Sequence, residues 1–399
     1  MLKGYRVLDC TGELGWLAGR LLADLGCNVV KIEPPGADLS APAWRGNNAG
    51  KRLLSLELSS KAGKAAFLKL AAKADFLLET AQPGSDLAKL FDIDALRELN
   101  PKLIHVSVTP FGRTGPRAEW KASDLELMAA SGAMSLAGEP GGVPLRVSAP
   151  QSHPWAASQA ACGAMVALIA RNSSGRGQHV DVSAQSATIA SIAHAPAFFD
   201  ILGQNAKRAG AFMTGRSVYG AVYRVFWPCK DGYVNFIIYG GVAGRRTNEG
   251  LCAWMRDAGA DLGVLADIDW ATFDSTQTTQ AEVDEMEKPI SAFFKTVPKA
   301  EFLKQAFERE MLGYPVNNVA DIAADPQLSE RGLWADLPGP GGKTERHLGG
   351  FACVDGKRLP APRPAPVKAG EHSRKILTEY GFKPKDISAL VRAKAVVVS

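Results

Sequence analysis

The chain has 399 residues, of which 46% are hydrophobic and 22% are charged, and it contains 40 glycines. These values are typical of a globular protein large enough for two domains. The net charge is only +5 and the basic residues are scattered among acids, which argues against a nucleic-acid partner. No apolar run reaches the ~18 residues that a membrane span requires, and no leader pattern opens the sequence. We therefore expect a cytoplasmic protein with no membrane partner.

The six cysteines form no C-x-x-C pair, and the six histidines show no ligand spacing with them, so no metal site is expected. Cys10 and Cys162 lie in segments predicted as strand and helix. We expect both to be buried thiols of a reducing compartment.

The first 110 residues alternate between short apolar runs and helical patterns. The expected strands are residues 5–9, 28–33, 53–58, 76–78 and 103–108, and helices are expected at 16–25, from a cap at Ser59 or Ser60 to Ala72, and at 94–99. Strands that alternate with helices predict right-handed βαβ units. The fold class is therefore α/β, with a Rossmann-like parallel sheet covered by helices on both faces.

Glycine-rich segments give a weaker signal. Gly12, Gly15 and Gly19 follow the first expected strand, but their spacing is not G-x-G-x-x-G, so no dinucleotide site is expected. Residues 175–178, Gly-Arg-Gly-Gln, are interpreted as a structural turn between helix and strand. From residue 223 a hairpin is expected around the turn at 230–232, followed by helices through Phe307. The Pro- and Gly-rich residues 337–343 and 360–366 predict chain crossings between domains.

Seven segments in chain order resemble the class III CoA-transferase family of the CaiB/BaiF type. They are LKGYRVLDCTGELG, LLETAQPGSDLAKL, HVSVTPFGRTGP, a small-residue helix ending in ALIAR before GRGQHVDV, YRVFWPCKDGYV, GYPVNNVADIAADPQLSERG and GEHSRKILTEYGF. The resemblance covers nearly the whole chain. It implies a large domain of residues 1–200 and 350–399, a smaller α+β domain of residues 223–335, and linkers at 201–222 and 336–349. It also implies an interlocked dimer.

In the family, the long helix begins at an aspartate that is the covalent nucleophile. Counting back from Arg171 at the family's spacing reaches His153, and no Asp or Glu lies between Glu139 and Asp181. A carboxylate can form an acyl anhydride and then a CoA thioester, whereas an imidazole cannot become a CoA thioester. His153 is interpreted as a polar residue at a helix start; substrate contact and acid/base catalysis are the alternatives.

The resemblance also suggests residues of a CoA cleft, two of which depart from the family pattern. Trp16 stands where relatives carry a small A-G-P turn. Its ring is interpreted either as part of the core or as a plug that fills the cleft. Thr80 lies in the turn where relatives have L-x-E-N-F, so a hydroxyl replaces an amide. Lys121 matches a basic position beside CoA, or is a solvated lysine. Asp124 is interpreted as a helix cap, with acid/base work as the alternative.

Three functional hypotheses follow. In the first, this chain is a non-catalytic subunit of a CoA-transferase, paired with a paralogous class III subunit that has the intact Asp. A similar member of the family, which acts on succinyl-CoA and benzylsuccinate in anaerobic aromatic degradation, has two subunits and one nucleophile. Coenzyme A or acyl-CoA would then be a substrate that the partner subunit alone could bind. The second hypothesis is a self-sufficient racemase or transferase of altered mechanism, and the third is an acyl-CoA-binding scaffold.

Overall fold

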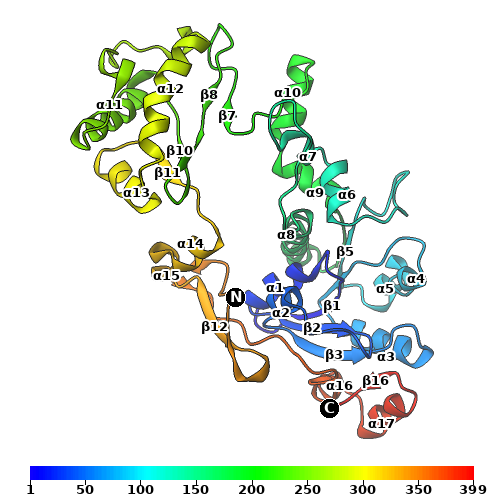
Figure 1. Cartoon of the computed structure of the whole chain (residues 1–399). Coiled ribbons are helices and arrows are strands. Elements are labelled where there is room, and N and C mark those ends of the chain that lie inside the picture. Colours follow the sequence, from blue (N-terminus) through cyan, green and yellow to red (C-terminus); the bar gives the residue numbers. More distant parts are fainter. The chain divides into compact units, whose positions relative to one another are not determined.

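The computed structural model describes residues 1–399, with every side chain except that of Pro340. The chain forms two compact units (Figure 1). The first unit contains residues 1–134, 146–205 and 326–399, so it is made from both ends of the chain, and the second contains residues 135–145 and 206–325. None of the described helices is long and apolar enough to cross a membrane.

A seven-stranded sheet is the framework of the first unit. Its strand order is β16-β3-β2-β1-β4-β5-β6, and all neighbours are parallel except β16, which pairs antiparallel with β3. The strands are β1 (Arg6–Cys10), β2 (Asn28–Glu33), β3 (Arg52–Leu56), β4 (Phe76–Glu79), β5 (Ile104–Thr109), β6 (His179–Ser183) and β16 (Val396–Val397). The five strands predicted in the first 110 residues are present within two residues of the expected bounds, which confirms the α/β class.

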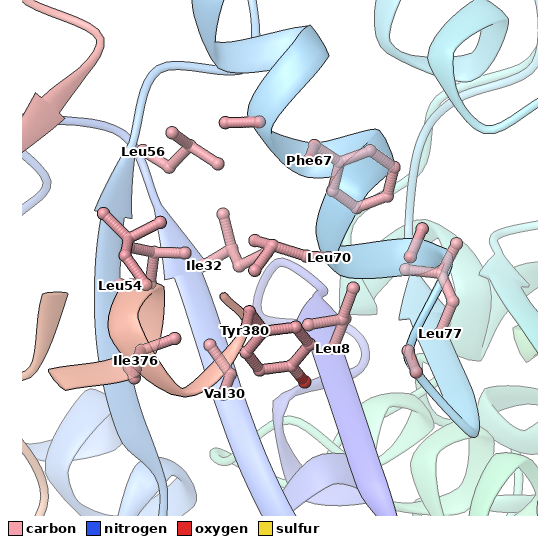
Figure 2. Close-up of a cluster of buried hydrophobic side chains, with 14 of the residues drawn as sticks. Leu8, Val30, Ile32, Leu54, Leu56, Phe67, Leu70, Leu77, Ile376 and Tyr380 are labelled. Atoms are coloured by element: carbon pink, nitrogen blue, oxygen red, sulfur yellow. The ribbon is translucent and has the colours of Figure 1, made fainter. Parts of the chain in front are cut away.

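Successive side chains along each strand point to opposite faces of the sheet, and both faces are buried by helices. Leu8 in β1 packs with Phe67 and Leu70 of α3 on one face, where Tyr380 also lies (Figure 2). Its neighbour Val7 packs on the other face with α1 and α8. The helices that belong wholly to this unit, whether or not they lie on the sheet, are α1 (Trp16–Asp24), α2 (Pro42–Asn48), α3 (Lys61–Ala71), α4 (Asp86–Leu90), α5 (Ile93–Leu99), α6 (Asp124–Ala130), α8 (Ser152–Ser174), α9 (Ala184–Ser191), α10 (His194–Leu202), α15 (Pro326–Glu330), α16 (Ser373–Glu379) and α17 (Pro384–Arg392). Helix α7 (Ala133–Leu136) begins in this unit and ends in the second.

The second unit has its own core, built on a three-stranded sheet in the order β11-β10-β9. The predicted hairpin is confirmed: β9 and β10 are antiparallel and meet at the turn Lys230–Asp231. The elements of this unit are β7 (Phe212–Met213), β8 (Tyr223–Arg224), β9 (Phe226–Cys229), β10 (Gly232–Phe236), α11 (Gly241–Asp257), α12 (Gln280–Phe294), α13 (Lys299–Glu308), β11 (Gly313–Pro315) and α14 (Val319–Ala324).

The two segments expected as linkers carry secondary structure. Residues 336–349 lie mostly in an antiparallel hairpin of β12 (Trp334–Pro338) and β13 (Thr344–Leu348). Gly341 and Gly342 have φ of 68° and 76° there, so the glycines form a tight turn and not a crossing. Within residues 201–222, α10 ends at Leu202 and β7 pairs with β8. A further short hairpin joins β14 (Cys353–Val354) to β15 (Lys357–Arg358).

The expectation for the cysteines is wrong at one position. Cys162 is exposed on α8, because it lies on the face of that helix opposite to the alanines that pack on the sheet. Cys10 at the end of β1 is half-buried, and burial raises the pKa of its thiol well above the usual range.

Candidate functional site

A cavity of about 500 Å³ opens at the carboxyl ends of the central strands. The strand order reverses between β1 and β4, and ligands of open α/β sheets bind in the crevice at such a switch point. The lining residues come from the ends of β1 to β4, from α3 and from α4: Cys10, Thr11, Gly12, Ile32, Glu33, Pro34, Leu56, Glu57, Leu58, Ser59, Lys64, Thr80, Asp86 and Leu87. The cavity is thus the first candidate site.

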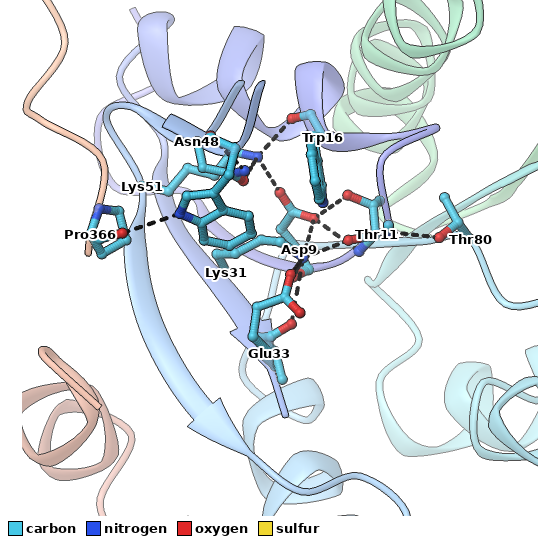
Figure 3. A network of polar contacts seen from close by, with 12 residues as sticks. Asp9, Thr11, Trp16, Lys31, Glu33, Asn48, Lys51, Thr80 and Pro366 are labelled. Carbon is cyan, nitrogen blue, oxygen red and sulfur yellow. Dashed lines mark hydrogen bonds and ion pairs between the residues drawn. The ribbon is translucent and has the colours of Figure 1, made fainter. Parts of the chain in front are cut away.

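The loop between β1 and α1 forms one wall of this cavity, and a buried lysine holds its first residue. The ammonium nitrogen of Lys31 lies 2.5 Å from the carbonyl oxygen of Thr11 and 2.9 Å from Oε1 of Glu33 (Figure 3). Asp9 Oδ1 accepts hydrogen bonds from the backbone N–H and the hydroxyl of Thr11. The start of the loop is therefore fixed from two sides.

A second buried lysine holds the far end of the same loop. Nζ of Lys51 lies 2.7 Å from the carbonyl oxygen of Trp16, 2.7 Å from Asp9 Oδ2 and 2.8 Å from Asn48 Oδ1 (Figure 3). Burial lowers the pKa of Lys51 to about 8, although the Asp9 carboxylate opposes this shift. A Cβ at Gly19 would lie 2.1 Å from Asp9 Oδ2, so a glycine is required for α1 to pass over this carboxylate.

Thr80 joins the loop to the end of β4. Its hydroxyl oxygen accepts a hydrogen bond of 2.7 Å from the backbone N–H of Gly12, and Thr80 lines the cavity. The buried Glu79 accepts a hydrogen bond of 2.5 Å from the N–H of Ala81 and lies 3.3 Å from Nη1 of Arg113. Of the four residues that the sequence suggested for a CoA cleft, Thr80 is the one that lines this cavity.

Trp16 packs in a small apolar cluster and does not line the cavity. Its ring packs at 90° against Trp44, with 5.4 Å between ring centroids, in a cluster with Leu39 and Leu53. The indole therefore has the contacts of a core residue and is not among the residues that line the cavity. Lys121 is exposed and is likewise absent from the lining; the carbonyl of its neighbour Trp120 accepts from Gln82.

Asp124 does not cap its own helix, as the sequence suggested, because Ser123 is the N-cap of α6. Asp124 is buried, and its Oδ1 accepts hydrogen bonds of 2.8 Å from the N–H groups of Gln151 and Ser152 and from the Ser152 hydroxyl. These N–H groups are at the start of α8, where the first turn of a helix has no backbone partners of its own. Asp124 thus caps the neighbouring helix.

His153 lies in the first turn of α8, directly after this cap. Its side chain is 18% exposed, and its Nδ1 is 4.0 Å from Oε1 of Glu13, which is 56% exposed. Glu13 follows Gly12 in the anchored loop. The loop therefore connects the cavity to the start of α8 and brings a carboxylate next to His153.

Sequence reasoning missed Asp9, Lys31, Lys51 and Glu13. The first three leave a visible signal, since each is a charged residue within or beside a buried apolar strand, where an unpaired charge is costly. Glu13 leaves no such signal in the sequence, because a glutamate in an exposed loop is common. Among the described residues, no group of three or more His, Cys, Asp or Glu side chains is arranged to hold a metal ion.

The model of the family described as CoA-transferase family III matches residues 2–373. The BbsE subunit of succinyl-CoA:(R)-benzylsuccinate CoA-transferase from Thauera aromatica is 30% identical, over 98% of this chain and 97% of its own. Succinate–glutarate CoA-transferase from Agrobacterium fabrum is 30% identical over 95% of both chains. The structure of a CAIB/BAIF family protein from Brucella suis superposes with a TM-score of 0.79, at 26% identity over 95% of this chain and 99% of that one. The chain therefore belongs to CoA-transferase family III.

Proposed function

We propose that this chain is a subunit of a CoA-transferase whose nucleophilic aspartate is supplied by a paralogous family III subunit. The observation that carries the proposal is His153 in the first turn of α8, at the position that the family resemblance assigns to the aspartate. Helix α8 contains no carboxylate of its own. This chain would then support catalysis without forming the acyl-enzyme.

The buried carboxylate of Asp124 has a structural role. Asp124 Oδ1 accepts three hydrogen bonds at the start of α8, so this carboxylate already serves to hold the first turn of that helix. An imidazole at position 153 could form an acyl-imidazole, but it could not form the CoA thioester that transfer between carboxylates requires.

The substrate class comes from the relatives. Two of them are named for reactions of succinyl-CoA or succinate, and the Thauera protein is named as a subunit of a larger enzyme. We infer that CoA moves between a succinyl-CoA-like acyl-CoA and an organic carboxylate, and that the partner is a second chain of this family. Interlocking of the two subunits is part of the proposal.

The chain itself is inferred to receive acyl-CoA in the cavity beside Thr80. The cavity of about 500 Å³ is open at the switch point, and Trp16 packs on Trp44 instead of entering it. These two observations favour binding here over binding in the partner subunit alone. Calorimetric titration of the purified chain with CoA tests this part directly.

One observation favours a second function, a self-sufficient transferase of altered mechanism. The exposed carboxylate of Glu13 lies 4.0 Å from His153, so a carboxylate is present near the position of the missing aspartate but on a different element. The Glu13 carboxylate would attack the thioester carbonyl, which forms a mixed anhydride and releases CoA as a thiolate. The thiolate would then attack the Glu13 carbonyl carbon of the anhydride, which forms a glutamyl-CoA thioester and releases the donor as a free carboxylate.

A single experiment separates these functions. The chain is incubated alone, and then with the paralogous subunit, in the presence of succinyl-CoA and a second carboxylate, and thioester intermediates are trapped with hydroxylamine and mapped by mass spectrometry. We expect transfer of CoA between the two carboxylates only in the complex, with the trapped residue on the partner subunit. Turnover by the chain alone with Glu13 modified would establish the second function. If the chain binds CoA but neither sample shows turnover, the chain is an acyl-CoA-binding scaffold.

A further inference from the structure

The loop of residues 11–15, which contributes a wall of the cavity, is held at its first residue and at Trp16, the first residue of α1, by buried ammonium groups. Lys31 donates to the carbonyl oxygen of Thr11, and Lys51 donates to the carbonyl oxygen of Trp16. Both lysines are at most 2% exposed. We propose that Lys31 and Lys51 are positioning residues that fix this loop in the shape that receives acyl-CoA; the ligand part of this inference rests on the proposed function.

Charge balance alone does not explain this arrangement. Asp9 and Glu33 balance the two lysines, but a buried ion pair contributes little net stability compared with packed apolar side chains. What a lysine adds here is a donor that reaches a backbone carbonyl. Each lysine reaches a different end of one loop, which apolar residues could not do.

The loop needs such anchors because its own sequence is permissive. Residues 12–15 are Gly-Glu-Leu-Gly, and glycine loses more conformational freedom on ordering than other residues. A Cβ at Gly15 would lie 2.7 Å from Cγ2 of Thr11, so the loop also packs tightly against itself. A loop ordered before binding spares the ligand the free-energy cost of ordering it.

Anchoring of the loop affects both the cavity and the contact between Glu13 and His153. Thr11 and Gly12 line the cavity, and Gly12 donates to Thr80, which lines it as well. Glu13, the next residue, lies beside His153 at the start of α8. Release of either anchor is therefore expected to loosen the cavity wall and the Glu13–His153 contact together.

The test uses a charge-balanced variant, since Lys51→Met alone leaves Asp9 with one cation fewer and could unfold the chain. The double variant Asp9→Asn/Lys51→Met removes one charge of each sign and the donor to the Trp16 carbonyl. The matched control is Lys73→Met, which removes a lysine that donates to the Tyr380 carbonyl at 2.8 Å, outside the set of residues that line the cavity. The readouts are hydrogen–deuterium exchange of residues 13–16 and the calorimetric Kd for CoA.

We expect the double variant to remain folded, to exchange the amides of residues 13–16 at least ten times faster than the wild type, and to bind CoA about tenfold more weakly. The control is expected to change neither readout. Unchanged exchange in the double variant would overturn the anchoring role, and faster exchange with an unchanged Kd would overturn the positioning role. If the wild type does not bind CoA, the cavity part of the proposed function fails, whereas the exchange measurement still decides whether the lysines hold the loop.

Discussion

The two polar parts of the candidate site differ sharply in how firmly they are built. Beneath the loop after β1, Asp9, Lys31 and Lys51 are almost fully buried, and each has several partners at hydrogen-bonding or ion-pair distance (Figure 3). At the start of α8, His153 is 18% exposed, and its ionic neighbour Glu13 lies 4.0 Å away and is itself half-exposed. The network beneath the loop is therefore firmly held, whereas the side chain of His153 has fewer partners.

This difference separates two requirements of a CoA-transferase. A binding cleft needs a fixed backbone, and the buried network supplies one. A covalent nucleophile needs a carboxylate held by a supporting shell of side chains, because a catalytic group must be fixed to about 0.5 Å. The side chain of His153 has no comparable shell among the described contacts. On the proposed function, the chain keeps an architecture that supports binding and carries His153 where the family resemblance places the nucleophile.

The largest effect is expected from Asp9→Asn. The variant leaves Lys51 and Lys31 buried with one carboxylate fewer, and removal of one partner from a buried ion pair costs about 3–5 kcal/mol. Denaturant unfolding measures this loss. The control is Asp94→Asn, which removes an exposed ion pair with Arg97 and should cost less than about 1 kcal/mol. If the two variants lose similar stability, the buried network is not the firmer part of the site.

A smaller loss of stability is expected from Asp124→Ala, which acts at the start of α8, the second polar part of the candidate site. The substitution leaves the N–H groups of Gln151 and Ser152 without their acceptor, and loss of a helix cap costs about 1–2 kcal/mol. Asp92→Ala removes a carboxylate cap that accepts one hydrogen bond from Ala95 on α5, and should cost no more than about 1 kcal/mol. Both losses are read from denaturant midpoints. A loss for Asp124→Ala below that for Asp92→Ala would contradict the role of Asp124 at α8.

The sequence predicted the sheet well because its strands are short, apolar and separated by helical patterns. It failed at residues 336–349, where Pro and Gly were read as a linker although they form the turn of a hairpin. Asp124 shows a second limit. Its residue type indicated a cap, but its partner helix begins 28 residues later, so only the folded chain reveals which helix it caps. Glu13 shows the same limit, because its proximity to His153 depends on tertiary structure.

The last test concerns pH dependence and the segment that follows α8 and leads into β6. His179, the first residue of β6, lies 2.9 Å from the Ser107 hydroxyl through Nε2, and burial lowers its pKa to about 4, with nearby His105 and Arg113 adding to the shift. An ordinary histidine in the unfolded chain gains its proton near pH 6.5, so between pH 6.5 and 4 the unfolded state binds more protons than the folded state. The free energy of unfolding should therefore fall as the pH drops through this window.

His179→Gln should remove that part of the fall, while the exposed His194→Gln should not. Denaturant midpoints of the three proteins at pH 7 and pH 4.5 provide the measurement. If His179→Gln loses as much stability on acidification as the wild type, His179 is not held neutral by its surroundings. If it loses less, the burial of His179 accounts for that part of the acid sensitivity, and the start of β6 holds this histidine more firmly than the first turn of α8 holds His153.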